Sequence, residues 1–265
     1  MLRKGKERTG LAVFVALIAA TVFVFAGCPT DTEDDLSGTG RGAYQTHQKV
    51  IGYSEVTLDK SGKVTTVTLD DYFDVNSWTA IADANVPADL TDTVKIGNSN
   101  YPAKIKIGDE VFTLDPNTTT ASYNGKVLGK DVKDITNWFT EKTNRTQAEY
   151  LWYIDACRSK NLAYLKADGT PSATKPSYTS SNKTTETMSK SETGYWTVTN
   201  GLGWTGNKEK IVAFAKSQNV GYSQKFADDL VGANKDTIAD ATAGATASDT
   251  GNYLKTILLA RNAVK

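Results

Sequence analysis

The chain has 265 residues, of which 39% are hydrophobic and 23% charged, a balance that suits one large domain or two small ones. Lys plus Arg and Asp plus Glu both total 30, so the whole chain is neutral at pH 7. Four basic residues against Glu7 give residues 1–10 a charge of +3, which leaves −3 for the remainder. A mildly acidic body argues against a nucleic-acid partner, whose phosphates require a basic face.

The N-terminus has the order of a targeting segment. An uncharged apolar run follows the basic residues over 11–26 and stops at Gly27-Cys28-Pro29. This run is shorter than the ~20 residues that a membrane-spanning helix prefers, although an uncleaved transmembrane helix is the alternative. The end of the run, FAGC, resembles a lipobox, the signal of bacterial lipoproteins, with Phe25 where leucine is commonest. The resemblance implies a signal peptide over 1–27 and a diacylglycerol, with palmitate-type acyl chains, on Cys28. We therefore expect a lipid-anchored, extracytoplasmic protein of the cell membrane or outer membrane.

Two cysteines and one histidine limit the chemistry that the chain can perform. A lipid on Cys28 leaves Cys157 without an intramolecular partner, so the fold must depend on its core. Cys157 lies in an apolar helical pattern, where burial is expected rather than catalysis. His47 precedes the predicted domain, so we expect no histidine-based metal site and no Ser/His/Asp triad.

The first elements of the chain are predicted to be a tether and two hairpins. Residues 28–48 are polar, contain glycines and have no apolar period, which predicts a flexible tether ahead of a domain over 49–265. Partial alternation and frequent β-branched residues over 50–69, with the turn DKSG, predict a β-hairpin. Residues 103–114 predict a second hairpin that turns at Gly108-Asp109.

The middle of the chain is predicted to be helical. Apolar residues at helical spacing over 131–143 predict one helix. Asn144, with Gln147 three residues later, resembles a capping box and predicts a second helix that reaches about Lys160. Residues 167–193 are rich in Ser, Thr, Lys and Pro, which predicts a long surface loop or linker.

The last third of the chain predicts one strand and two helices. Residues 195–198 have the composition of a strand, and a helix is expected from about Lys208. The last helix is expected from about Asn252, with Ser248 or Asp249 as its cap. Early hairpins and later helices together predict an α+β fold, in which helices pack on an antiparallel sheet, with a helical insertion and a Ser/Thr-rich loop.

The residues that carry most chemical information are Asp240-Ala-Thr-Ala-Gly244-Ala245-Thr246-Ala-Ser248. A carboxylate, a turn of small residues and hydroxyls come just before the last predicted helix. Gly244 allows a ligand to approach the backbone closely, and the free N–H groups of a helix start attract an anion. The segment is therefore a suitable place for a phosphate. A flexible turn rich in Ala, Thr and Gly is the alternative.

This segment resembles the motif of the FMN-binding domain family, Asp-x-x-Ser-Gly-Ala-Thr followed closely by Ser and a helix. The family includes subunits of sodium-pumping quinone reductases and of ion-translocating ferredoxin oxidoreductases. The resemblance implies that Thr246 receives FMN through a phosphoester bond, from a flavin transferase that uses FAD and magnesium. It also assigns the motif aspartate to Asp240, the turn to Gly244-Ala245 and the following serine to Ser248. Ala243 departs from the usual motif serine.

Two further stretches support the resemblance. Residues 52–73 resemble the hairpin that opens such domains, and Gly201-Leu202-Gly203 resembles a glycine-containing loop that approaches the flavin, although Val198-Thr199-Asn200 replaces the usual Glu-Thr-Pro before it. Residues 78–193 do not align with the family and have the character of an insertion.

The resemblance implies a membrane-tethered flavoprotein that relays electrons between a donor and an acceptor, rather than an enzyme with its own small substrate. Its cofactor would be covalent FMN, with magnesium needed only for attachment by the flavin transferase. The alternative is a ligand-binding or adhesive surface lipoprotein without flavin, which would use the Ser/Thr-rich loop and the predicted helix that contains Tyr150, Trp152 and Tyr153.

Overall fold

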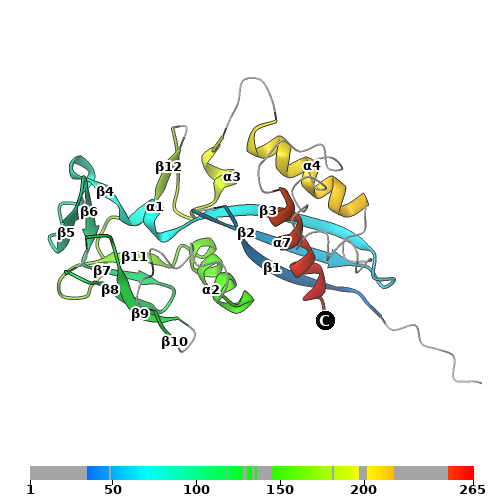
Figure 1. Ribbon diagram of the computed structural model, residues 1–265, viewed down its shortest axis with the longest axis horizontal. Helices are drawn as coiled ribbons and strands as arrows, with labels where there is room; N and C mark the ends of the chain where they lie inside the picture. The colour runs from blue at the N-terminus through cyan, green and yellow to red at the C-terminus, as the bar shows by residue number, and fades with distance from the viewer. Residues whose placement is uncertain are drawn as a thin grey trace, which may run out of the picture. The chain divides into compact units, whose positions relative to one another are not determined.

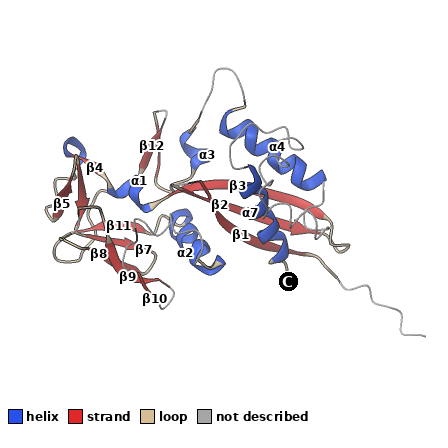
Figure 2. Ribbon diagram, viewed as in Figure 1, coloured by secondary structure: helices blue, strands red, loops and turns tan. Residues whose placement is uncertain are grey.

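The computed structural model describes residues 35–47, 49–117, 119–127, 130–132, 135, 145–180, 182–196, 202–217 and 250–265 (Figure 1). Residues 35–265 belong to one compact unit. The fold is α+β with antiparallel sheets, as the sequence predicts, and Figure 2 shows how strands and helices are distributed.

A three-stranded antiparallel meander forms the first sheet, in the order β1 (Gly38–His47), β2 (Val50–Leu58) and β3 (Val64–Phe73). The β2–β3 hairpin confirms the prediction for 50–69. The tether predicted over 28–48 is wrong from Gly38 onward, because β1 pairs with β2 along nearly its whole length. The glycines that indicated flexibility have another role, which is to admit a helix onto the strand.

The helix that lies against β1 is α7 (Thr250–Asn262), within two residues of the predicted start. A Cβ atom built on Gly40 would lie 2.1 Å from the Ala260 carbonyl oxygen, and one on Gly42 would lie 2.3 Å from the Ala260 nitrogen. Neither contact leaves space for a side chain, so α7 approaches β1 backbone to backbone. The predicted caps, Ser248 and Asp249, lie outside the described residues.

Helix α4 (Gly203–Ser217) packs on β3 and contacts α7. It begins five residues earlier than predicted, at Gly203 rather than Lys208. Apolar side chains of both helices and of the sheet form one core cluster, which includes Val56, Leu69, Trp204, Ile211, Leu254 and Ile257. Trp204 packs against Tyr253 with ring centroids 5.4 Å apart.

Helix α2 (Gln147–Arg158) packs on the opposite face of β1 and β2. Thr146 caps it and Glu149 completes the capping box, so the cap lies two residues after the predicted Asn144. The Gln147 amide instead bonds the edge of β1: its Nε2 donates to the Ala43 carbonyl (2.6 Å) and its Oε1 accepts from the Ala43 N–H (2.9 Å). Cys157 is fully buried, as predicted.

In the middle region α2 confirms the second predicted helix, but the other described residues there are mainly β structure, so the predicted helical insertion is only partly right. A five-stranded sheet has the order β10-β9-β8-β7-β11, and a smaller sheet has the order β4-β6-β5. Their bounds are β4 (Ile81–Ala82), β5 (Thr93–Ile96), β6 (Ser99–Pro102), β7 (Lys104–Ile107), β8 (Glu110–Leu114), β9 (Tyr123–Val127), β10 (Lys130–Val132) and β11 (Leu162–Leu165), with α1 (Val75–Thr79) and a 3₁₀ turn (Asp83–Asn85) beside β4.

The β7–β8 hairpin confirms the prediction for 103–114, and Gly108 adopts the left-handed conformation (φ 61°) that its turn requires. The helix predicted over 131–143 is wrong at its start, where β10 occupies Lys130–Val132. Of residues 133–143 the structure describes only Ile135, which is fully buried.

The loop predicted over 167–193 contains regular structure: the hairpin β12 (Tyr178–Ser180) and β13 (Lys183–Thr185), and the short helix α3 (Lys190–Thr193). Several of its Ser and Thr hydroxyls bond carboxylates or one another, for example Thr185, which donates to Glu192 (2.6 Å). The strand predicted from Tyr195 is also wrong at its start, because Tyr195 and Trp196 form a turn. Residues 197–198 are not described.

Candidate functional site

Most residues of the predicted flavin site lie outside the described part of the chain, as does Cys28, the predicted lipidation site. Those outside are Asp240, Gly244, Ala245, Thr246, Ser248 and Gly201. Leu202 and Gly203 are described: Gly203 is the buried first residue of α4, and the Leu202 carbonyl accepts a hydrogen bond from Gly206 (2.9 Å). These two residues therefore start a helix.

The start of α7 limits where the predicted acceptor can lie. Thr246 is four residues ahead of Thr250, and four extended residues span at most ~14 Å. Tyr253, in the first turn of α7, lines a cleft of about 560 Å³. Thr246 itself lies outside the described residues, seven positions before Tyr253 in the sequence.

Aromatic and basic side chains line this cleft together. Its aromatic members are Phe73, Tyr178, Tyr195, Trp196 and Tyr253, and its basic members are His47, Lys49 and Lys190. Phe73 lies between two other rings, with its centroid 3.9 Å from that of Tyr178 and 5.4 Å from that of Tyr195. The volume is within the range of about 300–1,000 Å³ that small-molecule sites have. Such a lining suits a planar ring system that carries negative charge.

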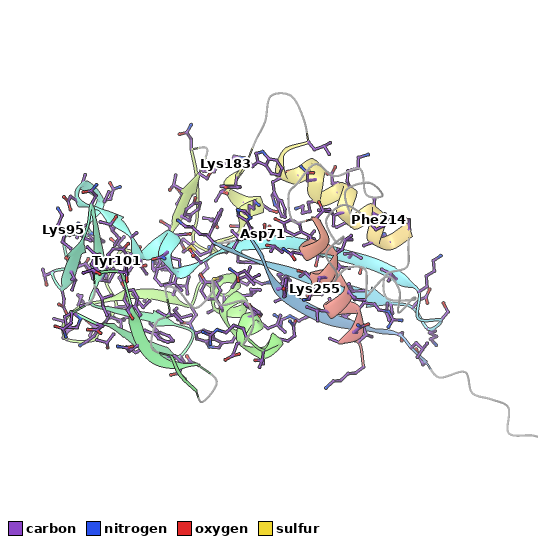
Figure 3. The ribbon with its side chains drawn as sticks, viewed as in Figure 1. Asp71, Lys95, Tyr101, Lys183, Phe214 and Lys255 are labelled. Atoms are coloured by element: carbon purple, nitrogen blue, oxygen red, sulfur yellow. The ribbon has the colours of Figure 1, made fainter. Side chains whose placement is uncertain are left out.

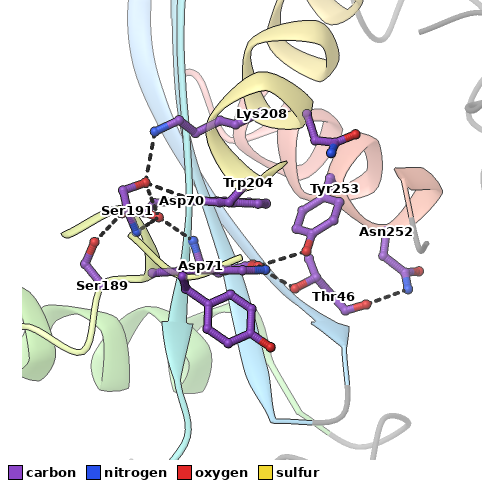
Figure 4. A network of polar contacts seen from close by, with 12 residues as sticks. Thr46, Asp70, Asp71, Ser189, Ser191, Trp204, Lys208, Asn252 and Tyr253 are labelled. Atoms are coloured by element: carbon purple, nitrogen blue, oxygen red, sulfur yellow. Dashed lines mark hydrogen bonds and ion pairs between the residues drawn. The ribbon is translucent and has the colours of Figure 1, made fainter. Parts of the chain in front are cut away.

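Asp71 on β3, labelled in Figure 3, is a fully buried carboxylate that contacts two residues of the cleft lining, Lys190 and Tyr253. Thr46 donates to its Oδ1 (2.8 Å), while Tyr253 (2.8 Å) and Lys190 (3.0 Å) donate to its Oδ2 (Figure 4). The Asn252 side chain donates to the Thr46 carbonyl (3.0 Å). We call these five residues the Asp71 network; it joins β1, β3, α3 and α7.

Lys190 is the cation of this network, and only 6% of the residue is exposed. Its Nζ lies 4.1 Å from the Trp204 ring centroid and 5.0 Å from that of Tyr195. The aromatic faces stabilise the ammonium group where water is largely excluded. An ion pair with Asp71 and two ring faces therefore fix Lys190 in the cleft wall.

The neighbouring carboxylate, Asp70, fixes the segment that carries Lys190. Ser189 Oγ donates to its Oδ2 (2.6 Å) and Ser191 Oγ to its Oδ1 (2.7 Å). Burial raises the pKa of Asp70, and the two serine hydrogen bonds oppose that rise. Ser191 Oγ also accepts from Trp204 Nε1 (3.0 Å) and Lys208 Nζ (2.9 Å), so α4 is held to the same point.

Two bulky residues beside α3 adopt a left-handed backbone conformation, Met188 (φ 58°) and Trp196 (φ 55°). This conformation costs on the order of 1–3 kcal/mol for such residues and persists only where the surroundings fix it. Here Phe73 N–H donates to the Met188 carbonyl (2.9 Å) and Trp204 N–H to the Trp196 carbonyl (3.1 Å). Segment 188–196 is thus held in a strained form at the cleft.

Sequence reasoning did not identify this cleft. Its residues come from β1, β2, β3, α1, β12, α3 and α7, and no short spacing in the chain relates them. The available signal was the pair Asp70-Asp71, because adjacent carboxylates between the apolar residues Leu69 and Tyr72 of a strand require buried partners.

Comparisons with family models, with curated proteins and with solved structures gave no match for this chain. Among the described residues, no helix has the length and apolar character that crossing a membrane requires. Within that same part of the chain, no group of three or more His, Cys, Asp or Glu side chains could hold a metal ion.

Proposed function

We propose that this protein is an exported lipoprotein that carries FMN, esterified through its phosphate to Thr246, and relays electrons outside the cytoplasm. The observation that carries the proposal is the position of the motif Asp240–Ser248. It directly precedes α7, whose first turn supplies Tyr253 to a cleft with aromatic and basic walls.

The chemistry of the cleft fits the ring system of FMN. Phe73, Tyr178 and Tyr195 offer ring surfaces for stacking, and Lys49 and Lys190 offer cationic hydrogen-bond donors. The N-terminus of a helix carries a partial positive charge, which would stabilise a phosphate placed close to the start of α7. FMN, when bound, supplies the capacity to accept and pass on electrons; the protein positions the group and sets its electrostatic surroundings.

Lipid attachment at Cys28 would hold the protein at a membrane, and esterification would hold the cofactor on the protein. Both are useful outside the cell, where a released cofactor diffuses away. A flavin transferase is then an obligatory partner, and magnesium is needed only for its reaction. The redox donor and acceptor are further partners.

The proposal is tested by co-expressing the protein with a flavin transferase. The wild type should give a yellow product with a fluorescent band that survives denaturing electrophoresis. Thr246→Val removes the acceptor hydroxyl and keeps the shape, so the band should be lost. Thr242→Val and Ser248→Ala are the matched controls, and both should keep the band.

A second variant tests the role assigned to Asp240. Asp240→Ala should give folded protein with little attached flavin, if this carboxylate recruits the transferase or its magnesium. A normal flavin content would remove Asp240 from the motif. A wild type without any adduct, despite an active transferase, would instead favour reversible binding of a planar anionic ligand in the cleft.

A further inference from the structure

The two residues of the Lys190–Asp71 ion pair differ in their position relative to the cleft. Lys190 lines the cleft, whereas Asp71 is fully buried behind it and does not. Lys190 is therefore the member of the pair beside the cleft, and its Nζ lies 3.0 Å from the Asp71 Oδ2 atom. In surroundings that exclude water, such an arrangement acts on a nearby ring more strongly than an exposed pair does.

Stability alone does not account for this pair. Desolvation of two buried charges offsets most of their attraction, so a buried ion pair contributes little net stability compared with apolar packing. The pair is nonetheless fixed by several contacts. Thr46 and Tyr253 hold the carboxylate, and the rings of Trp204 and Tyr195 flank the ammonium.

The charge next to a flavin ring determines how readily it is reduced. Uptake of two electrons and one proton leaves the ring system with one additional negative charge. A fixed cation at the ring stabilises that charge and so favours the reduced form. An ion pair and two cation–π contacts fix the position of Lys190, one of the basic residues of the cleft.

We propose that Lys190 raises the reduction potential of the attached flavin, and that the Asp71 network determines this effect by holding the ammonium in the cleft wall. The inference rests on the proposed function, since it concerns the same cofactor. The inference assigns to Lys190 the role of setting the reduction potential of the flavin, in addition to any contribution to binding the flavin ring.

The test is a reductive titration of the flavinylated protein with dithionite as the electron donor, followed by absorbance against a reference dye. Lys190→Gln retains a hydrogen-bond donor for Asp71 and removes the charge. The preference for the reduced form should fall about tenfold, which for a two-electron couple is a potential about 30 mV lower. Lys190→Arg keeps the charge and should restore most of the wild-type potential.

Lys208→Gln is the matched control. Lys208 bonds Ser191 in the same region (2.9 Å) but does not line the cleft, so its loss should leave the potential unchanged. If Lys190→Gln folds poorly because Asp71 loses its counter-charge, the double variant Lys190→Gln with Asp71→Asn replaces the pair by two neutral amides. That variant should also have a lower potential than the wild type.

Flavin content and potential distinguish the two proposals. A wild type without covalent flavin would contradict the proposed function. If all variants carry the same amount of flavin and Lys190→Gln has the same potential as the wild type and Lys208→Gln, the role of Lys190 is overturned. The proposed function would then remain intact.

Discussion

The Tyr253 hydroxyl donates a 2.8 Å hydrogen bond to the Asp71 carboxylate, and both groups are buried. This bond connects the first turn of α7 to β3, directly behind the cleft.

Tyr253→Phe removes the donor and leaves an oxygen of a buried carboxylate with one partner fewer. The free energy of unfolding should fall by about 1–3 kcal/mol, measured by urea denaturation. Tyr195→Phe, at a residue that is 38% exposed, is the control and should change stability by less than about 0.5 kcal/mol. Equal losses in both variants would contradict the importance of the Tyr253–Asp71 bond.

The close packing of α7 on β1 predicts a large effect of a single methyl group. Gly42→Ala would place its Cβ atom 2.3 Å from the Ala260 nitrogen and 2.5 Å from the Thr256 carbonyl oxygen, so the helix must move. We expect a loss of at least about 3 kcal/mol of stability, or failure to fold. Gly38→Ala lies on the same strand and meets the end of the Val264 side chain at 2.9 Å. It should cost much less, and equal melting temperatures for the two variants would show that β1 and α7 are not packed in this way.

Asp74 predicts a specific dependence of stability on pH. Burial raises the pKa of this carboxyl from 3.8 to about 6, against the hydrogen bonds that Ser77 donates to it. The folded protein therefore binds this proton more tightly than the unfolded chain does. The resulting stabilisation is fully present below pH 3.8 and is lost as pH rises to about 6, and it is worth roughly 2–3 kcal/mol.

Asp74→Asn retains an N-cap for α1 and removes the titration. Urea denaturation of both proteins at pH 4 and pH 7 measures the effect. The variant should gain stability relative to the wild type as pH rises between these values. A difference that is the same at both pH values would contradict the raised pKa.

Cys157 is fully buried, and burial raises the pKa of its thiol, so it should be inert in the folded protein. In a Cys28→Ala variant it is the only thiol that the sequence supplies. A chromogenic disulfide reagent at pH 8 should label this variant slowly under native conditions and quickly in denaturant. Rapid labelling of the native protein would contradict the burial of Cys157 on the inner face of α2.

The sequence predicted correctly those elements whose residues are determined by short-range patterns. The β2–β3 and β7–β8 hairpins and helix α7 follow from alternation, turn residues and helical spacing. The tether over 28–48 was predicted incorrectly because the glycines of β1 are required by contact with α7, which is more than 200 residues away in the chain. The Ser/Thr-rich segment 167–193 was predicted to be a loop because its partners, Asp70 and Asp71, lie far from it in sequence.

The candidate cleft could not be predicted for the same reason. Lys190 and Tyr195 have ordinary neighbours in the sequence, and only the fold places them beside Phe73 and Tyr253. The motif Asp240–Ser248 is the converse case. It is recognisable from a short spacing, but its residues lie outside those that the structure describes, so Thr246 stays a prediction.

The most direct test of the central claim is peptide mass spectrometry of the protein after co-expression with a flavin transferase. The claim predicts a single peptide that contains residues 240–248 and is heavier by the mass of FMN less one water, with fragment ions that assign the adduct to Thr246. An adduct on Thr242 or Ser248 would move the attachment site. Unmodified peptide throughout, beside a control substrate that the same transferase modifies, would contradict the covalent flavoprotein.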